Sequence, residues 1–160
     1  MNDAFLESDP EYLKRTRAVV VLHKGRIVIE HYAADIGPDT PVPGRSMTKS
    51  VMNALAGILV KEGLLTLNTK VLADAWSSPD DPRRRITIEH LLQMTSGLAF
   101  NGNMADPLAD VSRMILQELD MADFTANMPL EAEPGTRWQY STGTTNILAA
   151  VIRRVVGEDA

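Results

Sequence analysis

Ser46 and Lys49 stand three residues apart and carry a hydroxyl and an amine that together could perform acyl transfer. At this spacing the two side chains lie on one face of a helix, within reach of each other. A serine hydroxyl becomes a strong nucleophile when a base removes its proton, and lysine acts as that base only when it is neutral. Because the reference pKa of lysine is about 10.4, holding lysine neutral at pH 7 costs about 4.6 kcal/mol. Burial beside the apolar helix that follows Lys49 can supply this energy.

Two alternatives exist for this pair. Ser46 could merely cap the helix while Lys49 lies on its surface, and an isolated match to so short a motif favours that interpretation. The stretch from Gly44 to Ser50 could instead bind phosphate, but the positions where such a loop needs glycine hold Pro43 and Thr48. The Pro- and Gly-rich loop before Ser46 and the apolar helix after it favour the catalytic interpretation.

Tyr140 is the second candidate for chemistry. It follows the Pro134-Gly135 turn and directly precedes a predicted helix, so its phenol could face a cleft. Beside a lysine the pKa of a tyrosine falls, which makes it a better proton carrier. The alternative is that Trp138 and Tyr140, two residues apart, pack together on an apolar face of the core.

The elements that must position these residues are a hairpin and a set of helices. A β-branched apolar run, a Lys24-Gly25 turn and a second apolar run predict a β-hairpin over residues 18–32. The nucleophile helix is predicted over residues 47–61 and is apolar on most faces, which predicts burial on nearly all sides. A helical region follows over residues 62–160.

Three further helices are predicted within that region. Thr87 caps a short helix that stops at Gly97, and an amphipathic helix spans Pro107–Leu119. The last helix runs over Thr142–Val156 and ends at Gly157. Glu131 and Glu133 flank the Pro-Gly turn and are expected to be solvated.

These elements predict an α+β fold with an incomplete sheet. The first strand is apolar on both faces, as expected for a strand in a larger, covered sheet, whereas a lone hairpin is marginal in water. We therefore expect residues 1–160 to form the N-terminal portion of a single domain whose remaining, C-terminal strands are absent from this sequence. The alternative is a helical domain with one hairpin packed against it.

Composition excludes several classes of protein. A net charge of −5 argues against nucleic acid as a partner, despite the short Arg83-Arg84-Arg85 run. No cysteine is present, and His23, His31 and His90 are too scattered for a metal site, so we expect no metal and no cofactor. The polar N-terminus lacks a secretion signal and no apolar run suits a membrane, which predicts a cytoplasmic location.

Three stretches together resemble a known family. They are Gly44–Ser50, Ile88–Leu98 and Pro134–Gly143, and their order and spacing match over nearly the whole chain. The sequence resembles the serine β-lactamase, penicillin-binding-protein and family VIII esterase group. It is most similar to the β-lactamase-related aminohexanoate-oligomer hydrolases. The resemblance implies the N-terminal part of a β-lactamase/transpeptidase-like fold.

The resemblance also implies roles for the candidate residues. Ser46 would form a covalent acyl-enzyme, Lys49 would take its proton, and Tyr140 would shuttle a proton to the leaving group. The sequence departs from the family in two places. Thr142 stands where the class C enzymes and peptidases have asparagine, which puts β-lactam and peptidoglycan substrates in doubt. The third motif of the family, a Lys-Thr-Gly or His-x-Gly strand, is absent after the serine.

These observations predict a serine hydrolase, an esterase or amidase that acts on a small-molecule ester or amide. A penicillin-recognising D-Ala-D-Ala peptidase or a β-lactamase is the first alternative, and a non-catalytic binding module on the same fold is the second. The third motif would supply one of two oxyanion donors, and the loss of one such donor costs a factor of about 10² to 10³ in rate. The polypeptide by itself is therefore expected to be poorly active. The sequence leaves its oligomeric state open.

Overall fold

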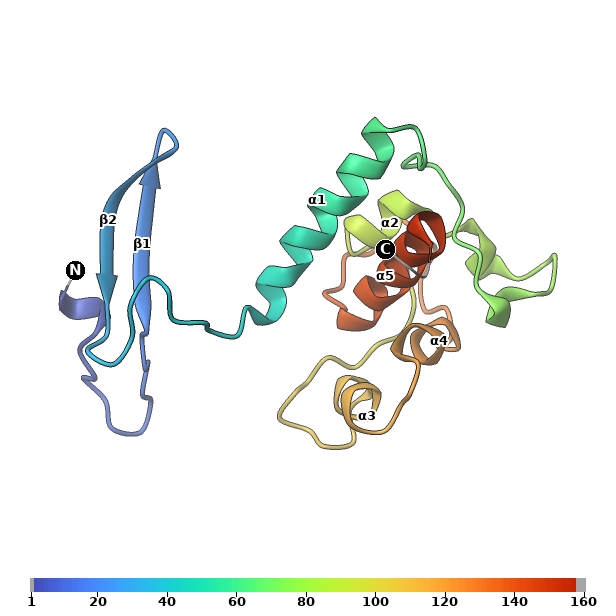
Figure 1. Cartoon of the computed structure of the whole chain (residues 1–160). Coiled ribbons are helices and arrows are strands. Elements are labelled where there is room, and N and C mark those ends of the chain that lie inside the picture. Colours follow the sequence, from blue (N-terminus) through green and yellow to red (C-terminus); the bar gives the residue numbers. More distant parts are fainter. Residues whose placement is uncertain (1, 158–160) are drawn as a thin grey trace. The chain divides into compact units, whose positions relative to one another are not determined.

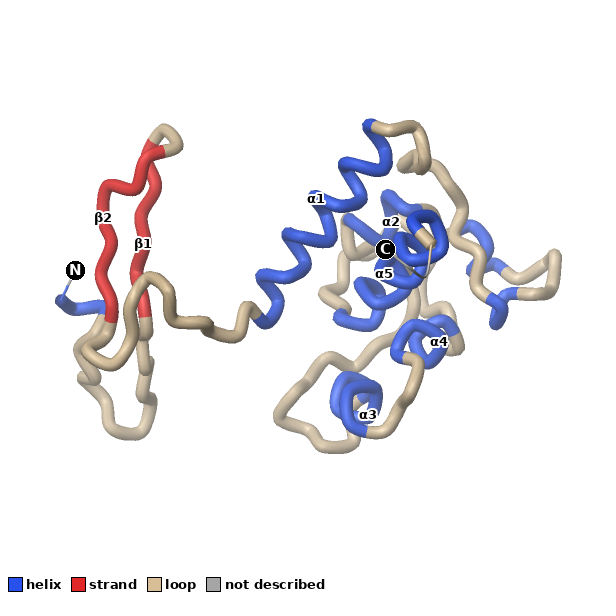
Figure 2. Tube along the Cα trace, in the orientation of Figure 1, coloured by secondary structure: helices blue, strands red, loops and turns tan. Residues whose placement is uncertain are grey.

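The computed structural model of the chain describes residues 2–157, which divide between two compact units (Figure 1). The first unit ends at Gly44 and the second begins at Arg45. Figure 2 shows that the strands belong to the first unit and that the second is built from helices and loops. The α+β class and the N-terminal hairpin expected from the sequence are confirmed.

The first unit contains a two-stranded antiparallel sheet. A short 3-10 turn, Asn2–Ala4, precedes β1 (Ala18–His23) and β2 (Arg26–Tyr32). Lys24 and Gly25 form the connection with φ angles of 48° and 76°, as a type I′ hairpin turn requires. A bulge interrupts the register between Val21 and Leu22. The apolar side chains of both strands are largely exposed within the described part of the chain.

The second unit contains five α-helices among the residues that the structure describes. They are α1 (Thr48–Lys61), α2 (Ile88–Leu92), α3 (Asp110–Leu116), α4 (Met121–Ala126) and α5 (Thr142–Val156). Short 3-10 turns occur at Arg45–Met47, Asp74–Trp76 and Pro82–Arg85. Helix α5 contacts α1, α2, α3 and α4, so it is the central element of this unit (Figure 1). In the described residues, no helix combines the length and apolarity needed to cross a membrane.

Helix α1 differs from its prediction in burial, although its bounds agree within one residue. It ends as expected at Lys61, with Glu62 as its C-cap, and Gly63 follows with a φ of 73°, a left-handed conformation that glycine adopts without strain. Only Ala56 and Leu59 are buried. The prediction of burial on nearly all sides is therefore wrong, because the neighbouring helices cover a single face of α1.

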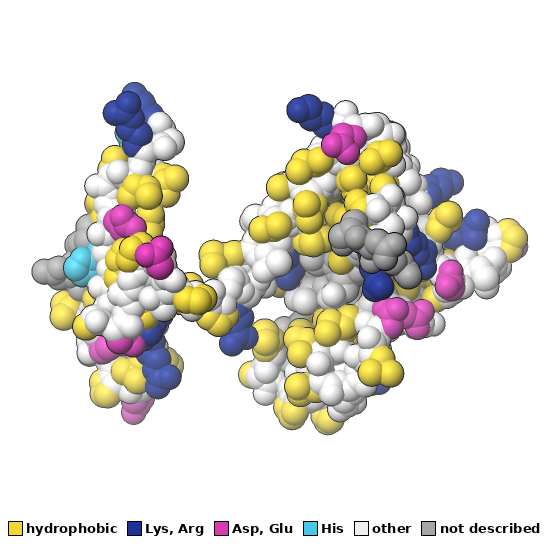
Figure 3. All heavy atoms as spheres, viewed as in Figure 1, with side chains coloured by type: hydrophobic (Ala, Val, Ile, Leu, Met, Phe, Trp, Pro, Cys, Tyr) yellow, Lys and Arg dark blue, Asp and Glu magenta, His cyan; other side chains and the backbone are white. Residues whose placement is uncertain are grey.

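The uncovered face of α1 forms an apolar stripe. Val51, Leu55 and Ile58 recur at helical spacing and are each exposed by 41% or more. Figure 3 shows hydrophobic side chains gathered along the surface of this helix. The core of the unit lies instead around Trp76, Ile86, Leu91 and the inner face of α5.

The region between α2 and α5 departs from the sequence prediction in two helices. The helix expected over Pro107–Leu119 is shorter, since α3 begins only at Asp110 and ends at Leu116. Helix α4 was missed altogether. Asp120 caps it by accepting hydrogen bonds from the backbone N–H groups of Ala122 and Asp123, and such a cap makes a helix of six residues possible.

Gly97 does not end a helix, contrary to the prediction. Helix α2 is capped by Thr87 as expected but stops at Leu92, and Met94 takes the left-handed conformation with a φ of 58°. The Gly97 carbonyl accepts hydrogen bonds from the N–H groups of Glu131 and Ala132. Gly97 is therefore a site of close backbone approach between two distant segments.

Candidate active site

Ser46 and Lys49 lie together at the start of α1. Ser46 is in the 3-10 turn that leads into the helix, and Lys49 is in the first helical turn. The Lys49 Nζ donates a hydrogen bond to Ser46 Oγ over 3.2 Å. Ser46 is exposed and Lys49 is partly buried. The amine is thus within proton-transfer distance of the hydroxyl, in an open site.

The backbone before Ser46 is held in an unusual conformation. Arg45 has a φ of 46°, in the left-handed region that non-glycine residues seldom adopt. The Thr48 hydroxyl donates a hydrogen bond of 2.7 Å to the Arg45 carbonyl and ties this turn to α1. Met47 occupies the N-cap position and no side chain caps α1. The interpretation of Ser46 as a helix cap is therefore wrong.

Tyr140 lies beside the same pair, although 91 or more residues separate it in sequence. The Lys49 Nζ is 5.0 Å from the centre of the Tyr140 ring. A hydrogen bond with the Ser46 side chain, followed by the interaction with Lys49, lowers the pKa of Tyr140 below its usual value, against the opposing effect of burial. The three predicted site residues are therefore brought together.

The alternative that Trp138 and Tyr140 pack an apolar core is wrong. Their side chains are 67% and 45% exposed. Between them, Gln139 faces the protein, since its N–H donates to the Met94 carbonyl and its side-chain amide to the Phe100 carbonyl. Alternate residues of an extended segment point to opposite sides, so anchoring Gln139 turns Tyr140 outward, towards Lys49.

Thr142 also belongs to this cluster and was not predicted as a site residue. The Lys49 Nζ donates a hydrogen bond of 3.4 Å to Thr142 Oγ1, across 93 residues of sequence. The available signal was the position of Thr142, two residues after Tyr140 and first in a predicted helix. That position by itself indicates only a departure from the motif of the family.

A side-chain cap and close packing hold the start of α5 in place. The Ser141 side chain caps α5 by accepting a hydrogen bond of 3.0 Å from the Thr144 N–H. Gly143 lies against Thr125 and Phe100 so closely that an added Cβ would be 2.6 Å from Thr125 Cγ2 and 2.7 Å from Phe100 Cε2. The absence of a side chain at Gly143 therefore allows α5 to approach α4.

Lys49 is less enclosed than the sequence predicts. Its side chain is partly buried, and the outer face of its own helix is exposed. Its amine interacts with the side chains of Ser46, Tyr140 and Thr142. The amine therefore lies among hydrogen-bonding groups.

Comparisons with known proteins place the chain in a family. The family model described as Beta-lactamase matches residues 9–160. The chain belongs to the beta-lactamase family. The esterase EstB of Burkholderia gladioli is 32% identical to it over 127 residues, which are 71% of this chain and 32% of the esterase. The 6-aminohexanoate-dimer hydrolase of Paenarthrobacter ureafaciens is 26% identical over 155 residues, or 89% and 38% of the two chains.

Solved structures agree with membership of the beta-lactamase family. A Bacillus anthracis protein assigned as a 6-aminohexanoate-dimer hydrolase has the same fold, with a TM-score of 0.69 and 22% identity over 88% of this chain and 40% of its own. A penicillin-binding protein from Bacillus halodurans gives a TM-score of 0.52 and 28% identity over 68% of this chain and 33% of its own. The chain spans about a third of the length of the curated relatives it matches.

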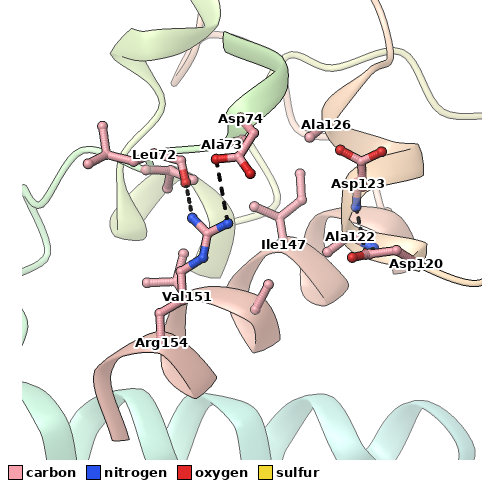
Figure 4. A pocket seen from close by; sticks show the side chains of 12 residues that line it. Leu72, Ala73, Asp74, Asp120, Ala122, Asp123, Ala126, Ile147, Val151 and Arg154 are labelled. Carbon is pink, nitrogen blue, oxygen red and sulfur yellow. Dashed lines mark hydrogen bonds and ion pairs between the residues drawn. The ribbon is translucent and has the colours of Figure 1, made fainter. Parts of the chain in front are cut away.

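A separate cavity in this beta-lactamase-family chain lies away from the three site residues. It measures about 230 Å³ and is bordered by the 71–74 segment, α4 and α5 (Figure 4). Its charged groups already have structural partners. Asp120 caps α4, and Arg154 donates a 2.7 Å hydrogen bond to the Leu72 carbonyl and lies 3.9 Å from Asp74. These polar groups therefore hold the walls of the cavity together.

Other polar residues singled out in the sequence also have structural roles. His90 and Thr87 form a reciprocal cap at the start of α2. Glu131 and Glu133 are exposed, as expected, and pair with Arg137 and Arg85. Within residues 2–157 no group of His, Cys, Asp and Glu side chains could hold a metal ion.

The hydrogen bond between Ser46 and Tyr140 makes a prediction about titration in this beta-lactamase-family chain. In Ser46→Ala the largest cause of the lowered pKa is removed, so we expect the pKa of Tyr140 to rise towards 10 and its phenolate to form at higher pH. Ultraviolet absorbance during a pH titration measures this change, and Tyr140→Phe identifies the signal among three tyrosines. An unchanged titration in Ser46→Ala would contradict the contact. Tyr32, held by Glu30, serves as an internal reference.

Proposed function

We propose that this chain supplies the nucleophile of a serine hydrolase that cleaves an ester or amide bond through an acyl-enzyme. The Ser46 oxygen attacks the substrate carbonyl and its proton passes to Lys49. Tyr140 then carries a proton to the leaving oxygen or nitrogen as the carbonyl bond to that atom breaks. Water then attacks the acyl carbonyl as Tyr140 takes a proton from it. Lys49 returns a proton to the Ser46 oxygen as the bond between this oxygen and the acyl group breaks.

The observation that carries this proposal is the convergence of hydroxyl, amine and phenol from distant parts of the chain. A Ser46–Lys49 distance of 3.2 Å suits proton transfer, and the pKa of Tyr140 is lowered by its contacts with the same two residues, in the direction that suits a proton carrier. A binding module would have no physical need for the three groups in contact. This supports the enzyme over the non-catalytic alternative.

The proposed substrate is a small-molecule ester or amide. Relatives in the family carry the names esterase and 6-aminohexanoate-dimer hydrolase, which supports this proposal. A peptidase or β-lactamase is the second candidate, favoured by the likeness to a penicillin-binding protein. The cytoplasmic location expected from the N-terminal sequence stays a prediction.

We also propose that residues 1–160 form the N-terminal portion of one domain, whose further strands supply the second oxyanion donor. The exposed apolar side chains of β1 and β2 support this, because strands with two apolar faces are normally covered. The backbone N–H of Ser46 is the donor that this chain can offer by itself. Slow reaction of the chain alone follows from this proposal.

Covalent labelling of Ser46 tests the proposed function. A fluorophosphonate forms a bond from Ser46 Oγ to phosphorus and releases fluoride, which needs the same activation as acylation. We expect mass spectrometry to locate one adduct at Ser46, and none in Ser46→Ala. Absence of an adduct in the wild-type chain would overturn the proposal. A fluorescent penicillin that labels Ser46 faster than the fluorophosphonate would instead establish the second candidate.

A further inference from the structure

We infer that Thr142 is a positioning residue whose hydroxyl orients the Lys49 amine towards Ser46. This inference rests on the proposed function and adds to it a residue with no assigned role. Its starting point is the pair of hydrogen bonds from Lys49 Nζ, over 3.2 Å to Ser46 Oγ and over 3.4 Å to Thr142 Oγ1.

The need for a second partner follows from the geometry of an amine. A neutral lysine amine has two N–H donors and one lone pair, and it accepts a proton only when the lone pair faces the Ser46 hydroxyl. Rotation about the last carbon–nitrogen bond decides which of the three faces Ser46. A hydrogen bond from one N–H to Thr142 restricts that rotation and leaves the lone pair available.

Thr142 can perform this role because it is more rigid than Lys49. The lysine side chain has a flexible four-carbon stem, whereas a β-branched threonine has restricted χ1 rotation. Thr142 is the first residue of α5, and its carbonyl accepts a 3.0 Å hydrogen bond from the Asn146 side chain. The close packing of Gly143 against Thr125 holds the same helical turn in place. A fixed hydroxyl therefore faces a mobile amine.

The surroundings of Lys49 make this contact more important than it would be in an enclosed site. Lys49 is only partly buried, so its hydrogen bonds help to fix the position of the amine. Tyr140 also interacts with the amine, through a hydrogen bond that helps to lower the pKa of the phenol and with Nζ 5.0 Å from the ring centre. The hydrogen bond to Thr142 adds a further directional restraint on the amine, from the start of α5.

The test compares three substitutions at Thr142 by the rate at which Ser46 reacts with a fluorophosphonate. Thr142→Val keeps the shape of the side chain and removes the hydroxyl. Thr142→Ala also removes the hydroxyl, and it places no β-branched side chain in α5. We expect both to slow labelling about 10- to 100-fold, as misplacement of a reacting group does. Thr142→Ser restores the hydroxyl and should recover most of the rate. The matched control is Thr145→Val in the same helix, where the hydroxyl bonds the Ser141 carbonyl instead of Lys49.

A second readout separates positioning from general loss of structure. The titration of Tyr140 should move in Thr142→Val and Thr142→Ala, because a displaced Lys49 changes its interaction with the phenol. Labelling of both variants at the wild-type rate, with an unmoved titration, would overturn the inference. Failure of the proposed function looks different, since the wild-type chain would then form no Ser46 adduct at all.

Discussion

Replacing Lys49 with methionine will slow the reaction of Ser46 with a fluorophosphonate by about 10²- to 10⁴-fold, the range that general-base catalysis contributes. Methionine has a similar length and remains compatible with a helix, but it has no nitrogen to take the serine proton. In the wild-type chain the amine lies 3.2 Å from the hydroxyl, so its loss leaves Ser46 without a base of comparable position.

The rate of Ser46 adduct formation, followed by mass spectrometry, measures this effect. Lys61→Met is the matched control, because Lys61 lies in the last turn of the same helix, about 18 Å away along its axis. If Lys49→Met reacts within about threefold of the wild-type rate, Lys49 is not the base.

Replacing Gly97 with alanine will destabilise the folded chain by about 3 kcal/mol or more, the largest stability effect that we expect from a single methyl group. The φ of 78° is strained for alanine by itself. In addition, the new Cβ would overlap the Ala132 carbonyl oxygen and lie 3.0 Å from its carbon. Both are backbone atoms, so no side-chain rotation relieves the clash.

Denaturant unfolding of Gly97→Ala beside Gly63→Ala separates the two causes. Gly63 has a similar φ of 73°, but nothing lies within 4 Å of a Cβ placed there. Gly63→Ala should therefore cost only about 1 to 2 kcal/mol, from backbone strain alone. Equal losses in the two variants would show that the approach of Ala132 contributes nothing.

The site was largely predictable from the sequence, because its chemistry depends on residue type and local spacing. The spacing of three positions from Ser46 to Lys49 places a hydroxyl and an amine on one helix face, within reach of each other. The contact with Tyr140 was expected from the resemblance to a family rather than from spacing. The position of Thr142 beside Tyr140 was visible in the sequence, but its contact with Lys49 was not, because the two residues meet only through the packing of α1 against α5.

The fold was predictable where local signals dominate and not where tertiary contacts decide. The hairpin turn at Lys24-Gly25 and the full extent of α5 follow from turn and cap residues, so their predicted bounds agree with the structure. The role of Gly97 depends on a segment more than 30 residues away, which no local pattern reveals. Burial of α1 failed as a prediction for the same reason, since an apolar composition does not say which faces have a neighbour.

The four interacting residues, Ser46, Lys49, Tyr140 and Thr142, lie at the starts of the first and the last helices of the second unit, so they come together in two separate steps. Ser46 and Lys49 meet as soon as the first turn of α1 forms, but the phenol and the threonine arrive only when α5 docks on that helix. The acidity of Tyr140 is therefore a spectroscopic marker of docking. Circular dichroism, by contrast, would report the helices themselves. In a partly folded intermediate with intact but undocked helices, the pKa of Tyr140 would not be lowered.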